Sequence, residues 1–147
     1  MRFHITTCLS LAEIDQAFAL IQHDAPTLTL PAWRHFARAA RQKPKSAGLV
    51  AVKDARGYFS GLCTYRRVIS LHHGAALAVD CFVALDFLNN HGVADQLLQH
   101  LEATALALEC TALEITLARQ DTRLIDQFRQ SGHILEGVLL CKTLPAP

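Results

Sequence analysis

The sequence contains no run of apolar residues that reaches the roughly 18 needed to cross a bilayer, and its first residues lack the apolar core of a secretion signal. Neither sign of charge is in excess, because 14 basic and 13 acidic residues leave a formal net charge of +1. The composition therefore gives no indication of binding to nucleic acid or another polyanion. We expect a soluble protein with no membrane or nucleic-acid partner.

Paired cysteine motifs are also missing. The five cysteines form no CxxC pair, are odd in number and lie within apolar segments, at Cys8, Cys63, Cys81, Cys110 and Cys141. No HExxH motif or Cys/His quartet is present either, so no metal site is predicted. This cysteine usage is typical of buried thiols in a reducing compartment, which predicts a cytoplasmic protein.

The two common nucleotide-binding fingerprints, GxxxxGK(S/T) and GxGxxG, are absent. The chain has instead an apolar, strand-like run at Leu77–Leu85, a polar turn at Asn89–Gly92, and an amphipathic helix that begins at Val93. A glycine before a helix lets the backbone approach a ligand, and the first helical N–H groups can bind an anion. The turn is therefore a candidate anion site.

The remaining segments predict helices and strands around this central unit. Helices are expected after a capping box formed by Ser10 and Glu13, from Pro31, and from Asp121 or Thr122 to Gly132. Strands are expected at residues 3–8, 49–52, 58–68, 113–118 and 134–144. This order predicts one α/β (α+β) domain over residues 1–147, with helices around a mixed sheet.

The strand, turn and helix resemble the GNAT superfamily of N-acetyltransferases, whose motif reads Arg/Gln-x-x-Gly-x-Gly/Ala. Gly92 and Ala94 match the motif, whereas Asn89 stands where the family has Arg or Gln. The resemblance extends from about Gly48 to Leu144. It implies a single GNAT-like domain with a mixed central sheet of six to seven strands, about four flanking helices, and a splay between the fourth and fifth strands.

The resemblance also implies a cosubstrate, acetyl-CoA or another acyl-CoA. Backbone groups of Phe82, Val83 and Ala84 would pair with the pantetheine arm as an added strand does. The pyrophosphate would bind at the turn and first helical residues, which are Asn89, Asn90, His91, Gly92, Val93, Ala94 and Asp95. Asp121 and Phe128, on the last helix, are included among the cofactor contacts. The alternative is an ordinary core strand followed by a plain helix start.

Acyl transfer to an amine needs a base and an acid near the splay. Family members often place a tyrosine four residues before the glycine that ends the last helix, but that position here is Phe128, which cannot donate a proton. The candidate base is Asp80, the only ionisable side chain in its strand, which a period of two places on one face with Phe82. Asp80 can instead pair with Arg66 or Arg67. Tyr65 is the alternative acid.

Other candidates have weaker support from the sequence. His72 and His73 titrate in a useful range, but adjacent histidines in a loop are more often solvated than functional. Cys81 has no evident base beside it, so we do not expect a nucleophilic thiol. A basic face lies where the family shapes its acceptor entrance, and such faces are usually only solvated. It consists of Arg34, Arg38, Arg41, Lys43 and Lys45.

The sequence thus predicts an acyl-CoA-dependent N-acyltransferase that passes an acetyl group directly to a primary amine of a small molecule or protein. One alternative is a non-catalytic acyl-CoA-binding or regulatory module on the same fold. Another is an interaction domain that binds no cofactor. The acceptor cannot be read from the sequence, and whether the protein forms a homodimer stays open.

Replacing Asn89 with arginine tests whether the turn binds pyrophosphate. Arginine adds a charge-assisted hydrogen bond, so Asn89→Arg should tighten acetyl-CoA binding by about 1 to 2 kcal/mol, or roughly 5- to 30-fold in Kd. Calorimetric titration of both proteins measures the change. An unchanged Kd would mean that the uncharged Asn89 is not a deficit.

Overall fold

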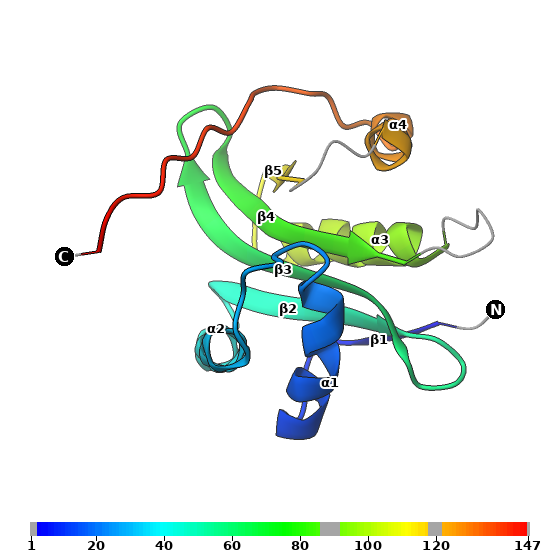
Figure 1. The fold of residues 1–147 in the computed structure, drawn as a ribbon. Coiled ribbons are helices and arrows are strands. Elements are labelled where there is room, and N and C mark those ends of the chain that lie inside the picture. The colour runs from blue at the N-terminus through cyan, green and yellow to red at the C-terminus, as the bar shows by residue number, and fades with distance from the viewer. Residues whose placement is uncertain (1–2, 86–91, 118–121, 147) are drawn as a thin grey trace.

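The computed structural model describes residues 3–85, 92–117 and 122–146. Within them the chain forms five strands and four helices around one sheet (Figure 1). In chain order these are β1 (His4–Thr6), α1 (Leu11–Ile21), α2 (Leu30–Gln42), β2 (Ala47–Lys53), β3 (Phe59–Ser70), β4 (Gly74–Ala84), α3 (Gly92–Ala107), β5 (Ala112–Ile115) and α4 (Thr122–Gln130). None of the helices in the described part of the chain is both long and apolar enough to cross a membrane.

The strands lie in the order β1-β2-β3-β4-β5, with β1 to β4 antiparallel and β5 parallel to β4. The mixed sheet of a single α/β domain is therefore as predicted. The predicted number of six to seven strands is too high for the described residues, because the expected last strand, residues 134–144, pairs with no other strand there. Its apolar pattern gives β propensity, but a strand also needs a partner for its backbone groups.

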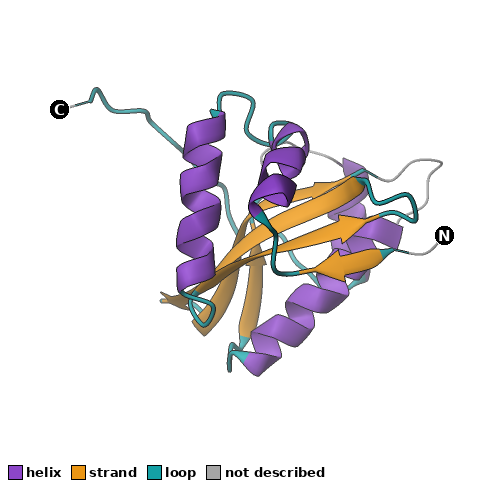
Figure 2. Cartoon of the chain, turned by 90° about the horizontal axis from the view of Figure 1, so that it is seen from below, coloured by secondary structure: helices purple, strands orange, loops and turns teal. Residues whose placement is uncertain are grey.

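Helices cover both faces of the sheet (Figure 2). One core joins α1 and α2 to the sheet and includes Ile14, Trp33 and Leu62. The other joins α3 and α4 to the opposite face and includes Leu97 and Phe128. Three of the five cysteines, Cys63, Cys81 and Cys110, are buried, but Cys8 and Cys141 are exposed, which corrects the expectation of buried thiols.

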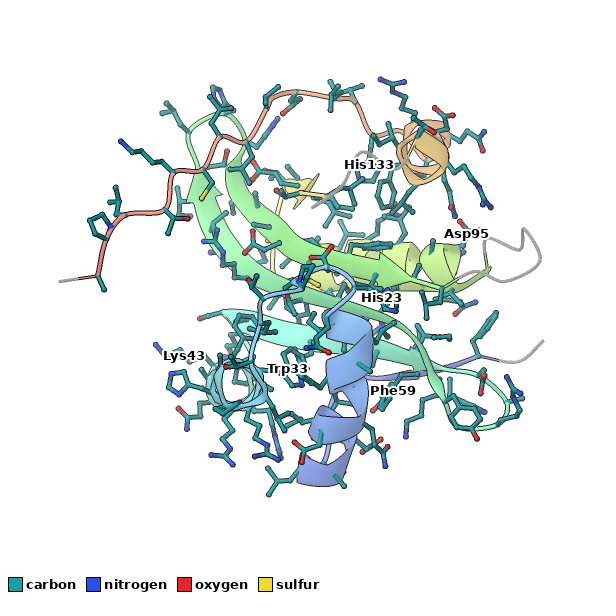
Figure 3. The ribbon with its side chains drawn as sticks, in the orientation of Figure 1. His23, Trp33, Lys43, Phe59, Asp95 and His133 are labelled. Atoms are coloured by element: carbon teal, nitrogen blue, oxygen red, sulfur yellow. The ribbon has the colours of Figure 1, made fainter. Side chains whose placement is uncertain are left out.

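Local signals set the ends of several elements as expected. Ser10 and Glu13 form the capping box of α1, each side chain accepting a hydrogen bond from the other residue's backbone N–H at 3.1 Å. Gly132 has a φ of 98° directly after α4, a conformation that favours glycine. Trp33 Nε1 donates to the buried carbonyl of Ile14 at 2.7 Å and so ties α2 to α1 (Figure 3).

Gly61 on β3 allows α3 to lie directly against the sheet. It pairs with Ala84, the last residue of β4. A Cβ at this position would overlap the Cγ1 of Val93 and lie 3.1 Å from the Cδ1 of Leu97. The missing side chain therefore fixes how closely the first turns of α3 approach the end of β4.

Adding a methyl group at Gly61 should separate α3 from the sheet. Because the valine side chain is stiff and cannot move aside cheaply, Gly61→Ala should lower the free energy of unfolding by about 1 to 3 kcal/mol. Val93→Ala makes room, so the same change should cost clearly less in that background. Urea unfolding of the four proteins measures both costs, and equal costs would contradict the contact.

Candidate active site

The candidate site lies where β4 and β5 stop pairing. The two strands pair from Ala76 with Ala112 to Val79 with Ile115, and the Thr116 N–H donates to the Val79 carbonyl at 2.9 Å. Beyond Val79, β4 continues to Ala84 with no partner on its β5 side among the described residues. We call Asp80–Ala84 the open edge of β4, and it lies where the splay was predicted.

A β-bulge at Asp80 begins this open edge. Thr64 pairs with Cys81 and Tyr65 pairs with Val79, so Asp80 is an extra residue in β4. As a result Val79, Phe82 and Ala84 all pack against the core beneath α3, although an unbroken strand would turn Val79 to the other face. The prediction that Asp80 shares a face with Phe82 is therefore wrong, because it assumed an uninterrupted period of two.

The bulge also changes which backbone groups face the open edge. The carbonyls of Ala75 and Val79 accept bonds from the β5 side, whereas the N–H of Leu85 donates to Ser60 of the β3 side at 2.8 Å. In a strand, the backbone groups of successive residues point alternately to the two sides. Since those of Leu85 point towards β3, the N–H and C=O of Val83 also point towards β3, and those of Phe82 and Ala84 point towards the open edge. Of the three predicted backbone contacts, two face the open edge.

Helix α3 begins close to the end of the open edge, at Gly92. Gly92, Val93, Ala94 and Asp95 form its first turn, while Asn89, Asn90, His91 and Asp121 lie outside the described residues. Val93 and Ala94 are each 1% exposed. Asp95 accepts a hydrogen bond from Gln127 Nε2 at 2.7 Å, which joins the start of α3 to α4 (Figure 3).

The candidate base forms an exposed ion pair. Arg66 Nε lies 2.8 Å from Asp80 Oδ2, and both side chains are more than half exposed. Arg67 is engaged elsewhere, since its Nε donates to the Leu108 carbonyl. The pairing of Asp80 with Arg66 is thus the alternative that the sequence left open, and the carboxylate stays accessible at the bulge.

The candidate acid, Tyr65, pairs across the sheet with Val79, next to the bulge. Its ring lies against Gly48, where a Cβ would overlap the tyrosine hydroxyl. Burial raises the pKa of the Tyr65 hydroxyl, so at neutral pH it is protonated and can donate. Burial also raises the pKa of the Cys81 thiol, which argues against a thiolate nucleophile.

Phe128 is a core residue that joins α4 to β4. It is 5% exposed, and its ring meets Phe82 edge to face with centroids 5.1 Å apart. The ring of His133 lies 5.5 Å from it, and His133 Nε2 is buried without a hydrogen-bond partner among the described atoms. The sequence analysis did not single out His133. The signal that could have indicated it is its place next to Gly132, since the residue that follows a helix stop often packs back on the helix.

Arg34 and Arg38 of the basic face line a pocket together with Leu11, Ile14 and Asp15 at the α1 side. Arg34 makes an ion pair with Asp15 on α1, Nη2 to Oδ2 at 2.8 Å, so this part of the basic face holds the two helices together. No three His, Cys, Asp or Glu side chains in the described segments are grouped so that they could hold a metal ion.

No protein-family model matches the chain, and no curated protein matches it significantly. Its fold, in contrast, is found in many solved structures. The aminoglycoside N-acetyltransferase AAC(6')-Iy, solved with a bisubstrate analogue of CoA and acetylneamine, superposes with a TM-score of 0.80 at 13% identity, covering 99% of this chain and 100% of that one. Glucosamine-6-phosphate N-acetyltransferase from Arabidopsis thaliana gives 0.77 at 9% identity, over 99% and 100%.

A transcriptional regulator from Bacillus halodurans also matches, with a TM-score of 0.77 at 13% identity over 97% of this chain and 100% of that one. The chain therefore has the fold of the GNAT acetyltransferases. At these identities the likeness establishes the fold alone.

Proposed function

We propose that this protein is an acyl-CoA-dependent N-acetyltransferase that transfers an acetyl group to a primary amine. The observation that supports this most directly is the open edge of β4, which ends close to the first turn of α3. An extended amide-containing arm can pair with such an edge, and an anionic group can bind at a helix N-terminus. Acetyl-CoA carries both groups on one molecule.

The residues present fit this cosubstrate. Backbone groups of Phe82 and Ala84 would hold the pantetheine amides, and the first turn of α3 at Gly92 would stabilise the pyrophosphate. Val93 and Ala94 add no charge there, and Gly92 adds no side chain. Acetyl-CoA would supply an activated thioester, whose acyl carbon would lie beside the bulge.

The side chains at the bulge suggest how an amine would be activated. A carboxylate at Asp80 would attract the ammonium form of the acceptor and take its proton, since only the neutral amine is a nucleophile. Arg66 donates one hydrogen bond to this carboxylate through its Nε. The hydroxyl of Tyr65 lies against Gly48 on β2, and the buried Phe128 ring has no proton to give, so the thiolate would leave unaided or take a proton from water.

A non-catalytic acyl-CoA-binding module is the second candidate. It is favoured by Phe128, which fills the position of the usual acid with a core side chain, and by the similarity of the fold to a protein described as a transcriptional regulator. The two candidates share the binding site and differ only in turnover. Thiol release from acetyl-CoA across a panel of amino sugars, peptides and small amines separates them.

Binding is tested first, with a matched pair of variants at Gly92. Acetyl-CoA at 100 times its Kd should stabilise the native state by about 2.7 kcal/mol and raise the melting temperature. Gly92→Glu should abolish this shift, whereas the isosteric Gly92→Gln should weaken it less, because only glutamate repels the pyrophosphate.

The same pair controls for damage to the fold. A negative charge in the first turn favours a helix, so Gly92→Glu without ligand should melt no lower than Gly92→Gln. Equal binding by the two variants would show that no anion binds at this turn. If millimolar acetyl-CoA does not raise the melting temperature of the unmodified protein, the proposal is wrong.

The role of Asp80 is tested by removing each partner of its ion pair in turn. Asp80→Asn and Arg66→Gln both break the pair, but only the first removes the carboxylate. Asp80→Asn should therefore lower kcat/KM for the amine by about 100-fold or more, while Arg66→Gln should change it little.

Both variants should fold, since an exposed pair contributes at most about 1 kcal/mol. The KM for acetyl-CoA should stay the same in both. Equal losses of activity in the two variants would reduce Asp80 to a structural partner of Arg66.

A further inference from the structure

Charge is distributed unevenly along the chain. Helix α2 and the loop that follows it, residues 30–46, contain the five side chains of the basic face and no acidic residue. Since the whole chain has 14 basic and 13 acidic residues, the rest of it has 9 basic and 13 acidic residues, a formal net charge of −4. A surface that concentrates one sign of charge attracts partners of the opposite sign.

Little of this charge is neutralised within the protein. Arg34 forms two hydrogen bonds with Asp15, from Nε to Oδ1 and from Nη2 to Oδ2, each 2.8 Å long. Arg41 Nη1 donates to an uncharged backbone carbonyl at 3.2 Å. The other three side chains of the basic face are exposed and form no ion pair within the described segments: Arg38, Lys43 and Lys45. These three charges are available to a partner.

A small pocket adjoins the basic face. It has a volume of about 190 Å³ and lies between the start of α1 and the middle of α2. Leu11 and Ile14 give it apolar walls, and Arg34, Arg38 and Asp15 border it. Pockets that hold a whole small molecule usually measure at least about 300 Å³, so this one suits a single side chain of a protein partner.

The apolar residues nearby favour a protein partner over a membrane or a nucleic acid. Helices that bind membranes insert an apolar face, but the apolar face of α2 is at most 6% exposed and packs inside the domain, through Trp33, Ala37 and Ala40. Leu11 is 60% exposed at the pocket. A phosphate backbone has no apolar group to place against it, whereas a polypeptide can present carboxylates and an apolar side chain together.

We propose that the surface formed by α1 and α2 binds an acidic segment of a partner protein. One apolar side chain of that segment would fill the pocket beside Leu11, and its carboxylates would contact the basic face. Protein interfaces commonly combine a buried anchor, which supplies affinity, with charged groups at the rim, which speed association. The surface lies on the face of the sheet opposite α3 and α4 and shares no residue with the candidate active site (Figure 2). The inference therefore does not depend on the proposed enzymatic activity.

A designed peptide tests the surface in the full-length chain. The probe is a fluorescein-labelled peptide with one leucine between two runs of glutamate, and its binding is measured by fluorescence anisotropy. It should bind at low salt and more weakly as salt screens the charges. A peptide with serine in place of the leucine should bind about 3- to 10-fold more weakly, because it leaves the pocket unfilled. Leu11→Ser should remove this difference between the two peptides.

Charge reversal at Arg38 locates the contact. Arg38→Glu should weaken binding of the leucine peptide about 10-fold, with Arg38→Gln in between, because attraction is replaced by repulsion. Arg129→Glu makes the same change in net charge on the exposed side of α4 and is the matched control, which should change the affinity less than about 2-fold. Fluorescence of the single tryptophan, the buried Trp33 on α2, checks that each variant is folded.

Three outcomes would overturn the proposal. If the peptide does not bind at millimolar concentration and low salt, the surface is only solvated. If Arg38→Glu and Arg129→Glu weaken binding equally, the peptide responds to net charge and not to this surface. If a single-stranded oligonucleotide or phosphatidylserine vesicles displace the peptide at a lower concentration of negative charge than an unlabelled copy does, the partner is a nucleic acid or a membrane.

Discussion

The end of pairing between β4 and β5 at Val79 is the constraint on which the rest of the structure depends. The bulge at Asp80 lies one residue beyond the last residue of β4 that pairs with β5. It exchanges the faces of the sheet towards which the following side chains of β4 point. Phe82 and Ala84 then pack beneath α3 while their backbone groups face the open edge. A single extra residue therefore sets both the core contacts of this strand and the direction of its unpaired groups.

Packing of α3 and α4 on one face of β4 holds the open edge in place. Gly61 brings α3 against the sheet at Ala84, and Phe128 of α4 meets Phe82 edge to face. These contacts hold the end of β4 from one side, and β3 pairs with it along its other edge. The described residues of the open edge are thus held by β3, α3 and α4, and under the proposed function such a prearranged edge would lower the ordering cost of ligand binding.

The sequence predicts those features that local residues determine. The capping box at Ser10, the helix stop at Gly132 and the strand followed by a helix at Gly92 each depend on neighbours in the chain, and all three are present. The bulge at Asp80 was missed because it depends on how β3 pairs with β4, which no periodicity in β4 reveals. The last strand, residues 134–144, was also predicted from its own residues, but a strand needs a paired neighbour, and none of the described strands pairs with this segment.

Backbone hydrogen bonds explain why the open edge of β4 suits a ligand. Each strand residue brings a donor and an acceptor that must find partners if they are to be buried. Among the described residues, the four-residue β5 leaves β4 without a partner on that side beyond Val79. Under the proposed function, an amide-bearing ligand would supply these partners.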